Sequence, residues 1–268
     1  MKIKNAILLC LLFSGIQLGT SLLVGILFGS LGIDTESIIF GITVMIIYIL
    51  SFGIIIFIGY KKSKQKFNEV FKFNKVSMNY WLAIIVFMFG FIIISSEIDN
   101  VINYFLPMPE FFQDTFDSLM GKQIFIISFL MIGILPALLE EMFFRGVVLN
   151  GFYNNYSEKK AILISALLFG LIHLNPWQFV TAFIIGIIMA WVCIKTKSIL
   201  LCIYMHLFNN LTGVIVLRLR DVIKIRGFNT AGSERVFQPL WFDALGAVIV
   251  VFGVLLLIKA YKKGPVLK

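Results

Sequence analysis

The chain has 268 residues, of which 60% are hydrophobic and 14% are charged, and its mean hydropathy is +0.98. A water-soluble domain does not have this composition, so we interpret residues 1–268 as a single integral membrane domain. The formal net charge of +9 would suggest nucleic-acid binding in a soluble protein. Here the basic residues lie between apolar runs, where they indicate topology and attraction to anionic lipid, so nucleic acid is excluded as a partner.

The apolar runs are the main structural signal, because roughly 20 apolar residues cross the ~30 Å hydrocarbon core of a bilayer. They predict an all-α polytopic protein with eight transmembrane helices, at about residues 6–31, 38–60, 80–96, 123–152, 161–174, 177–194, 199–217 and 240–258. Asn175 and Pro176 predict an N-cap and a first-position proline at the sixth helix, after a very tight turn. Phe111, Phe112 and Phe116 predict a short interfacial helix on the outer surface.

The cysteines add no covalent framework. Cys10, Cys193 and Cys202 all lie inside apolar runs, without ligand-like spacing. We therefore expect neither a disulfide framework nor a zinc–cysteine site.

Basic residues in the short loops predict the orientation, because Lys and Arg are retained on the cytoplasmic side. Six lysines lie in residues 61–75 against one acidic residue, whereas residues 97–117 hold five acidic residues and no basic one. The first loop is therefore expected inside and the second outside, which puts both termini in the cytoplasm. One loop disagrees, because Arg218, Arg220, Lys224, Arg226 and Arg235 fall outside; a re-entrant or surface-lying segment, or a misplaced last helix, would account for it.

Burying an ionisable side chain at mid-bilayer costs at least ~2.5 kcal/mol of free energy, so each such residue inside a span calls for an explanation. The fourth span contains Glu140, Glu141 and Arg145, and the fifth and seventh contain His173 and His206, the only two histidines in the chain. A rise of ~1.5 Å per residue puts Glu140 roughly 22 Å, His173 roughly 20 Å and His206 roughly 14 Å from their cytoplasmic loops. These depths are compatible with one layer in the inner half of the membrane.

The fourth span also has a pattern within itself. Residues four apart share a helix face, so Glu141 and Arg145 can pair, while Glu140 is turned about 100° away and is left for another role. Pro136 cannot donate to the carbonyl of Ile132, so the helix can kink where the carboxylates begin.

The other polar residues form similar pairs. Phe169 lies one turn before His173, and Asn210 one turn after His206. Each observation has a structural reading, because an ion pair, a core histidine or an interhelical asparagine can serve packing alone. Their coincidence at similar depth favours a functional site.

Three motifs carry a family resemblance. Residues 140–145 read EEMFFR and match EExxxR, residues 169–173 read FGLIH and match FxxxH, and residues 206–210 read HLFNN and match HxxxN. In this order on separate helices, over about residues 123–213, they resemble the CAAX-protease and bacteriocin-processing family, also called the ABI family of intramembrane endopeptidases.

The resemblance implies an eight-helix fold with a catalytic cavity opening to the cytoplasm. It implies that Glu140 and His173 activate water and that His206 and Asn210 stabilise the oxyanion. Glu141, Arg145 and Phe169 would support the motifs. Its substrates would be prenylated CAAX proteins, or bacteriocin and pheromone peptides.

Physical chemistry is consistent with these roles, since peptide hydrolysis needs a base, oxyanion donors and an acid for the leaving amine. Zinc ligation by Glu140, His173 and His206 is possible, but no cofactor is favoured. We expect an intramembrane endopeptidase acting on a membrane-associated peptide or protein in a bacterial cell membrane. The alternatives are a catalytically silent immunity factor or scaffold for a partner such as a sensor kinase, and a proton-coupled transporter, which would usually show repeated halves.

Overall fold

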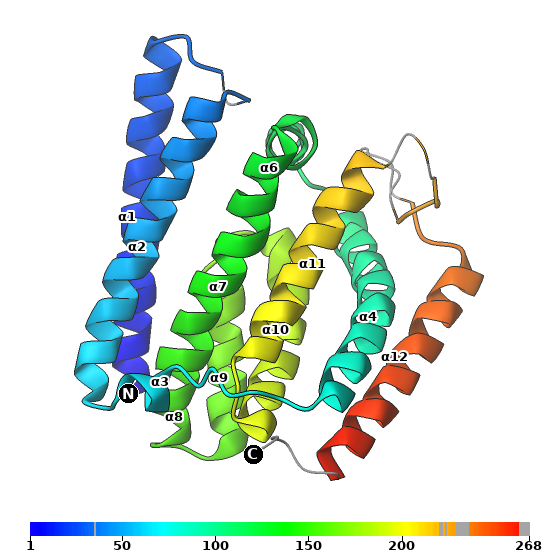
Figure 1. Ribbon diagram of the computed structural model, residues 1–268. Coiled ribbons are helices and arrows are strands. Elements are labelled where there is room, and N and C mark those ends of the chain that lie inside the picture. The colour runs from blue at the N-terminus through cyan, green and yellow to red at the C-terminus, as the bar shows by residue number, and fades with distance from the viewer. Residues whose placement is uncertain (35, 220–221, 223, 229–235, 263–268) are drawn as a thin grey trace.

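The computed structural model describes residues 1–34, 36–219, 222, 224–228 and 236–262. Over these residues the protein is all-helical, without strands, which confirms the expected fold class. The long helices are α1 (Ile3–Ser30), α2 (Ile38–Ser63), α4 (Met78–Phe105), α10 (Pro176–Thr196), α11 (Leu200–Arg218) and α12 (Leu240–Lys262). Figure 1 shows α1 and α2 paired at one side of the bundle and α4 beside α12 at the other.

Seven of the helices in the described part of the chain are long and apolar enough to cross a membrane, so this is an integral membrane protein. The fifth predicted span is the exception. It forms α9 (Glu158–Leu171), whose 14 residues extend roughly 21 Å and fall short of the ~30 Å core. Gly170 and Gly186 allow α9 to pack closely on α10, since a side chain at Gly170 would stand 3.0 Å from the ring of Phe179.

The helix that carries the EExxxR motif is built from alternating α and π turns. It runs through α6 (Phe125–Ser128), η2 (Phe129–Ile134), α7 (Leu135–Glu141), η3 (Met142–Leu149) and α8 (Asn150–Tyr153). The π turns were not predicted. Pro136 leaves the carbonyl of Ile132 without its helical donor, and the Asn210 side chain donates to that carbonyl at 2.9 Å.

One predicted boundary on the acidic side was wrong. The third helix does not end at residue 96: α4 continues to Phe105, so Glu97 and Asp99 are helical rather than in a loop. The expected interfacial helix is α5 (Glu110–Phe116), which continues as the π turn η1 (Asp117–Lys122). Phe111 is 74% exposed, as an interfacial side chain would be.

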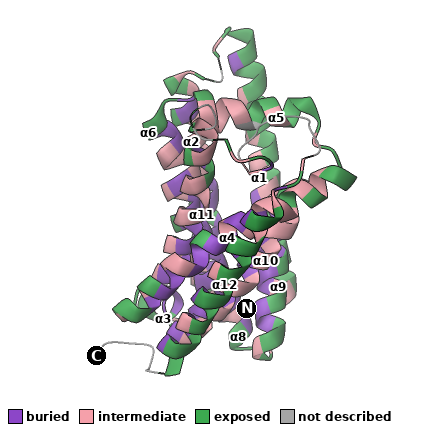
Figure 2. Ribbon diagram, turned by 90° about the vertical axis from the view of Figure 1, so that its right-hand side faces the viewer, coloured by how far each residue is buried: buried purple, intermediate pink, exposed green. Residues whose placement is uncertain are grey.

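The bundle has two chemically different ends. One end holds the N-terminus, the lysine-rich connection with α3 (Phe67–Val70), and α8 (Figure 1). We call it the lysine-rich end. The other end holds α5, η1 and the connection from α11 to α12, and we call it the acidic-loop end. Buried residues gather in the interior between these ends, and exposed apolar residues cover the outside (Figure 2).

One of the basic residues that did not fit the predicted orientation makes several hydrogen bonds. Arg218 is the last residue of α11, and its guanidinium donates to the carbonyls of Met120, at 3.0 Å, and of Gln123, and to the Ser128 hydroxyl at 3.1 Å. This arginine therefore ties α11 to the start of the motif helix. Arg220 and Arg235 lie outside the described residues.

Candidate active site

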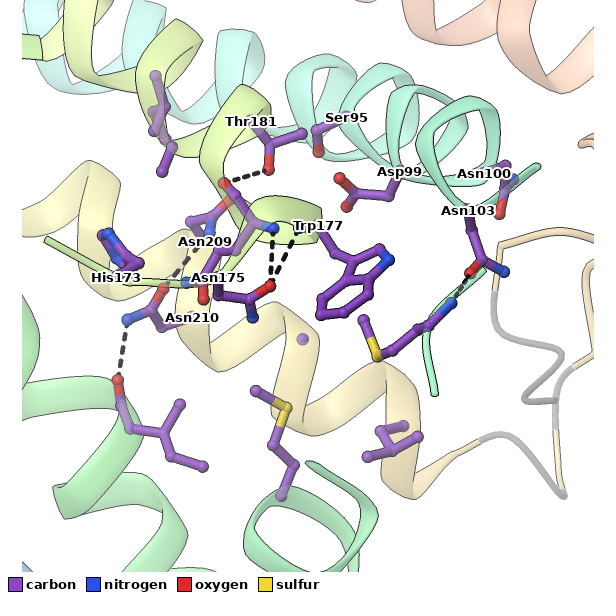
Figure 3. Close-up of a pocket in the computed structure, with 18 of the residues that line it drawn as sticks. Ser95, Asp99, Asn100, Asn103, His173, Asn175, Trp177, Thr181, Asn209 and Asn210 are labelled. Atoms are coloured by element: carbon purple, nitrogen blue, oxygen red, sulfur yellow. Dashed lines mark hydrogen bonds between the residues drawn. The ribbon is translucent and has the colours of Figure 1, made fainter. Parts of the chain in front are cut away.

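A cavity of about 930 Å³ lies between α4, α10, α11 and the motif helix. His173, His206 and Asn210 are among its lining residues, as is Phe169. Glu140, which is 8% exposed, is not among them. Figure 3 shows His173 and Asn210 at one end of the cavity and Asp99, Asn100 and Asn103 of α4 at the other.

Only one of the two carboxylate oxygens of Glu140 accepts a hydrogen bond in the described structure. The hydroxyl of Tyr48 on α2 donates to Oε1 at 2.5 Å. Oε2 lies 3.9 Å from Nε2 of His173 and has no hydrogen-bond partner among the described residues. This separation is too long for a hydrogen bond, but one water molecule could bridge the two atoms.

His173 lies in the turn after α9 rather than inside a helix, which corrects the expected span of residues 161–174. The chain turns here because Leu174 adopts a positive φ of 51° and Asn175 caps α10, with its side chain accepting from the backbone N–H groups of Trp177 and Gln178. The predicted N-cap and first-position proline are thus present. The turn places the imidazole at the cavity wall.

The tautomer of His173 follows from its partner. Nδ1 lies 2.8 Å from the carbonyl oxygen of Phe169. A carbonyl can only accept, so Nδ1 carries the proton and Nε2 of the neutral ring is an acceptor. Nε2 and Glu140 Oε2 are therefore two acceptors that face each other across 3.9 Å.

Glu141 joins two of the motifs. Its Oε2 lies 2.9 Å from Nε of Arg145, and both side chains are completely buried. Its Oε1 lies 3.0 Å from Nδ1 of His206. The expected pair of Glu141 and Arg145 is therefore present, and the contact with His206 adds a link that the sequence did not predict.

Phe169 packs at the centre of this network. The Arg145 guanidinium carbon lies 4.5 Å from the centre of the Phe169 ring, and the rings of His173 and His206 meet it edge-on at 5.2 and 5.6 Å. The ring excludes water from the ion pair, which strengthens the attraction between the charges. It also fixes the spacing between the two histidines.

Asn210 and His206 share the cavity wall but are not hydrogen-bonded to each other in the described structure. Nδ2 of Asn210 donates to Ile132, as given above, and its Oδ1 accepts from Asn209 at 3.3 Å. An amide nitrogen carries two hydrogens, so the bond to Ile132 uses only one of them.

A shared metal site is not formed by these side chains. Across the residues that the structure describes, no group of three His, Cys, Asp or Glu side chains could hold one metal ion. Glu140, His173 and His206, the zinc ligands considered from the sequence, are therefore not assembled as such a group. The chemistry below is derived from the protein's own side chains.

Two parts of the site were missed by sequence reasoning. Tyr48 stands in the middle of an apolar run, far from the interfaces where membrane tyrosines usually lie, and this position was the available signal. The cavity wall on α4, which includes Asp99, Asn100 and Asn103, was missed because its polar residues looked like a loop.

The fold and the site together define a class: a polytopic membrane protein with a buried carboxylate–histidine pair beside an internal cavity. The family model described as type II CAAX prenyl endopeptidase Rce1-like matches residues 122–212, a segment that contains all three motifs. The resemblance to the CAAX protease family is confirmed over this third of the chain, and it supports an intramembrane peptide hydrolase. No curated protein and no solved structure matches the chain.

Proposed function

We propose that this protein is an intramembrane endopeptidase that hydrolyses a peptide bond near the C-terminus of a membrane-associated protein or peptide, of the CAAX type or of the bacteriocin or pheromone type. The observation that carries the proposal is the pair formed by Glu140 Oε2 and His173 Nε2, two acceptors 3.9 Å apart. A water molecule that donates one hydrogen to each acceptor keeps its lone pairs free for attack on a carbonyl carbon.

The reaction then uses this water molecule and three side chains. The water oxygen attacks the carbonyl carbon while its proton passes to Glu140, and the carbonyl oxygen becomes an oxyanion. His206 and Asn210 stabilise this oxyanion as hydrogen-bond donors. When the C–N bond breaks, Glu140 returns the proton to the leaving amine, so the carboxylate is regenerated.

His206 can donate to the oxyanion only in one form. Its Nδ1 proton is directed at Glu141, so donation through Nε2 requires the doubly protonated ring.

The test is Glu140→Gln, which keeps the shape of the side chain and its acceptor for Tyr48 but removes the base. Comparison of membrane and secreted peptides from cells with the parent and the variant protein should show uncleaved substrates accumulating with Glu140→Gln. Glu110→Gln is the matched control, because Glu110 lies on α5 outside the site. If peptide profiles of the Glu140→Gln and parent cells were the same, the protein would be a silent immunity factor or scaffold.

A further inference from the structure

The residues that line the cavity extend to one end of the bundle. Its lining includes Asn103 at the end of α4, Gln113 and Asp114 on α5, and Leu217 at the end of α11. All four belong to the acidic-loop end. Of the residues that the structure describes in the lysine-rich connection 61–77 and in the turn 154–157, none lines the cavity. A substrate therefore reaches His173 and His206 from the acidic-loop end.

The charges of the chain indicate which side of the membrane this is. Among the described residues, and apart from Arg145 inside the bundle, every Lys and Arg residue belongs to the lysine-rich end except Lys122, Arg218, Lys224 and Arg226. Most acidic residues belong to the acidic-loop end. Because Lys and Arg are retained in the cytoplasm, the lysine-rich end is cytoplasmic.

We propose that the active-site cavity opens at the extracytoplasmic face and that the substrate is a peptide segment presented on that side of the membrane. This inference rests on the proposed peptidase function and adds the side from which the substrate comes. It departs from the cytoplasmic opening implied by the family resemblance. The cavity position and the charge-based orientation cannot both hold with a cytoplasmic opening.

The basic residues at the acidic-loop end do not reverse this orientation. The guanidinium of Arg218 donates to backbone carbonyls and to a hydroxyl group of the motif helix. Lys122 forms an ion pair with Glu36 at 3.5 Å. The lysines of the lysine-rich end mostly lie on exposed loops and helix ends. At such positions Lys and Arg are retained on the cytoplasmic side.

The charged and aromatic side chains at the rim of the cavity indicate which kind of substrate fits. Three acidic residues, Asp99 on α4, Asp114 on α5 and Asp117 on η1, line the cavity against one basic residue, Lys224. Trp177 and Phe112 form a ring contact beside it, with centroids 5.3 Å apart. A carboxylate rim repels anions and attracts cations. The substrate that fits is an apolar peptide with a neutral or cationic flank, rather than an acidic one.

Cysteine accessibility in intact cells tests the opening without a known substrate. The natural cysteines Cys10, Cys193 and Cys202 are all buried, so the parent protein provides the unreactive background. Asp114→Cys marks the rim, Thr181→Cys marks the cavity wall, and Lys62→Cys marks the exposed lysine-rich end. The probe is a small membrane-impermeant methanethiosulfonate cation, with later alkylation by a maleimide of defined mass as the readout.

We expect the first two cysteines to react in intact cells and Lys62→Cys to react only after the membrane is opened. Reaction of Lys62→Cys in intact cells, with Asp114→Cys and Thr181→Cys protected, would overturn the proposal. This result would not touch the peptidase function, which the Glu140→Gln experiment tests separately. Asn103→Cys, also at the rim, replaces Asp114→Cys if that variant does not accumulate.

Discussion

Two neighbouring glutamates should respond in opposite ways to the same substitution. Glu141→Gln keeps an acceptor for His206 but removes the charge that Arg145 faces at 2.9 Å, with both side chains completely buried. Breaking a buried ion pair on one side costs about 3–5 kcal/mol. This corresponds to roughly two to three and a half powers of ten in the unfolding equilibrium.

Glu140→Gln should cost no stability. The amide oxygen can still accept from Tyr48, and the substitution removes a buried charge that has one oxygen without a hydrogen-bond partner in the described structure. Removing such a charge is neutral or favourable for folding. Both variants should lose cleavage, because Glu140→Gln lacks the base and Glu141→Gln lacks the negative charge that faces both Arg145 and His206.

Thermal unfolding in detergent measures the difference without a substrate. Since the three cysteines are buried, a thiol-reactive fluorescent dye reports their exposure as the protein unfolds. We expect a midpoint close to that of the parent for Glu140→Gln and a clearly lower one for Glu141→Gln, with reduced abundance in the membrane. Equal midpoints for the two variants would refute the assignment of Glu141 to structure and Glu140 to chemistry.

The remaining predictions concern single contacts of the site. Tyr48→Phe should lower the turnover number about 10- to 100-fold with little change in KM, because a hydrogen bond to a charged group contributes ~1.5–3 kcal/mol; Tyr60→Phe on the same helix is the control, and equal rates for the two would contradict a positioning role. Asn210→Ala should lower the unfolding midpoint as well as activity, since the carbonyl of Ile132 loses its donor, and an unchanged midpoint would mean that another group replaces the amide. Purified protein should keep its activity in a strong chelator, and His206→Gln should retain some of it, because loss of one oxyanion donor typically costs ~10²–10³. Stoichiometric zinc that is lost together with activity in His206→Gln would establish metal ligation instead.

The membrane helices and the meeting of the three motifs could be predicted because both depend on local spacing. Apolar runs define spans by length alone, and residues four apart share a face whatever surrounds them. The pair of Glu141 and Arg145 is a case in which this local rule was sufficient. The same rule predicted that Glu140 faces away from Arg145, and in the structure Glu140 lies against Tyr48 and His173.

Other features depend on contacts between distant segments and gave no local signal. Tyr48 meets Glu140 across 92 positions of sequence, and nothing in the periodicity of either helix indicates the other. The run through residues 161–174 reads as one apolar helix, but the positive φ of Leu174 and the close packing of α9 on α10 end it early. The polar residues after position 96 resembled a loop because their partner is the cavity rather than lipid.

The motifs also differ in what their residues explain. Glu141, Phe169 and Asn210 each hold another part of the site in place, so a protein that needed only the fold would still depend on them. Glu140 is different, because its one hydrogen bond in the described structure comes from Tyr48 and its buried Oε2 accepts none. A buried ionisable group that does not help to hold the fold together is expected at a site of catalysis. We therefore expect Glu140→Gln to be the substitution that turns an active peptidase into a silent scaffold with the same fold.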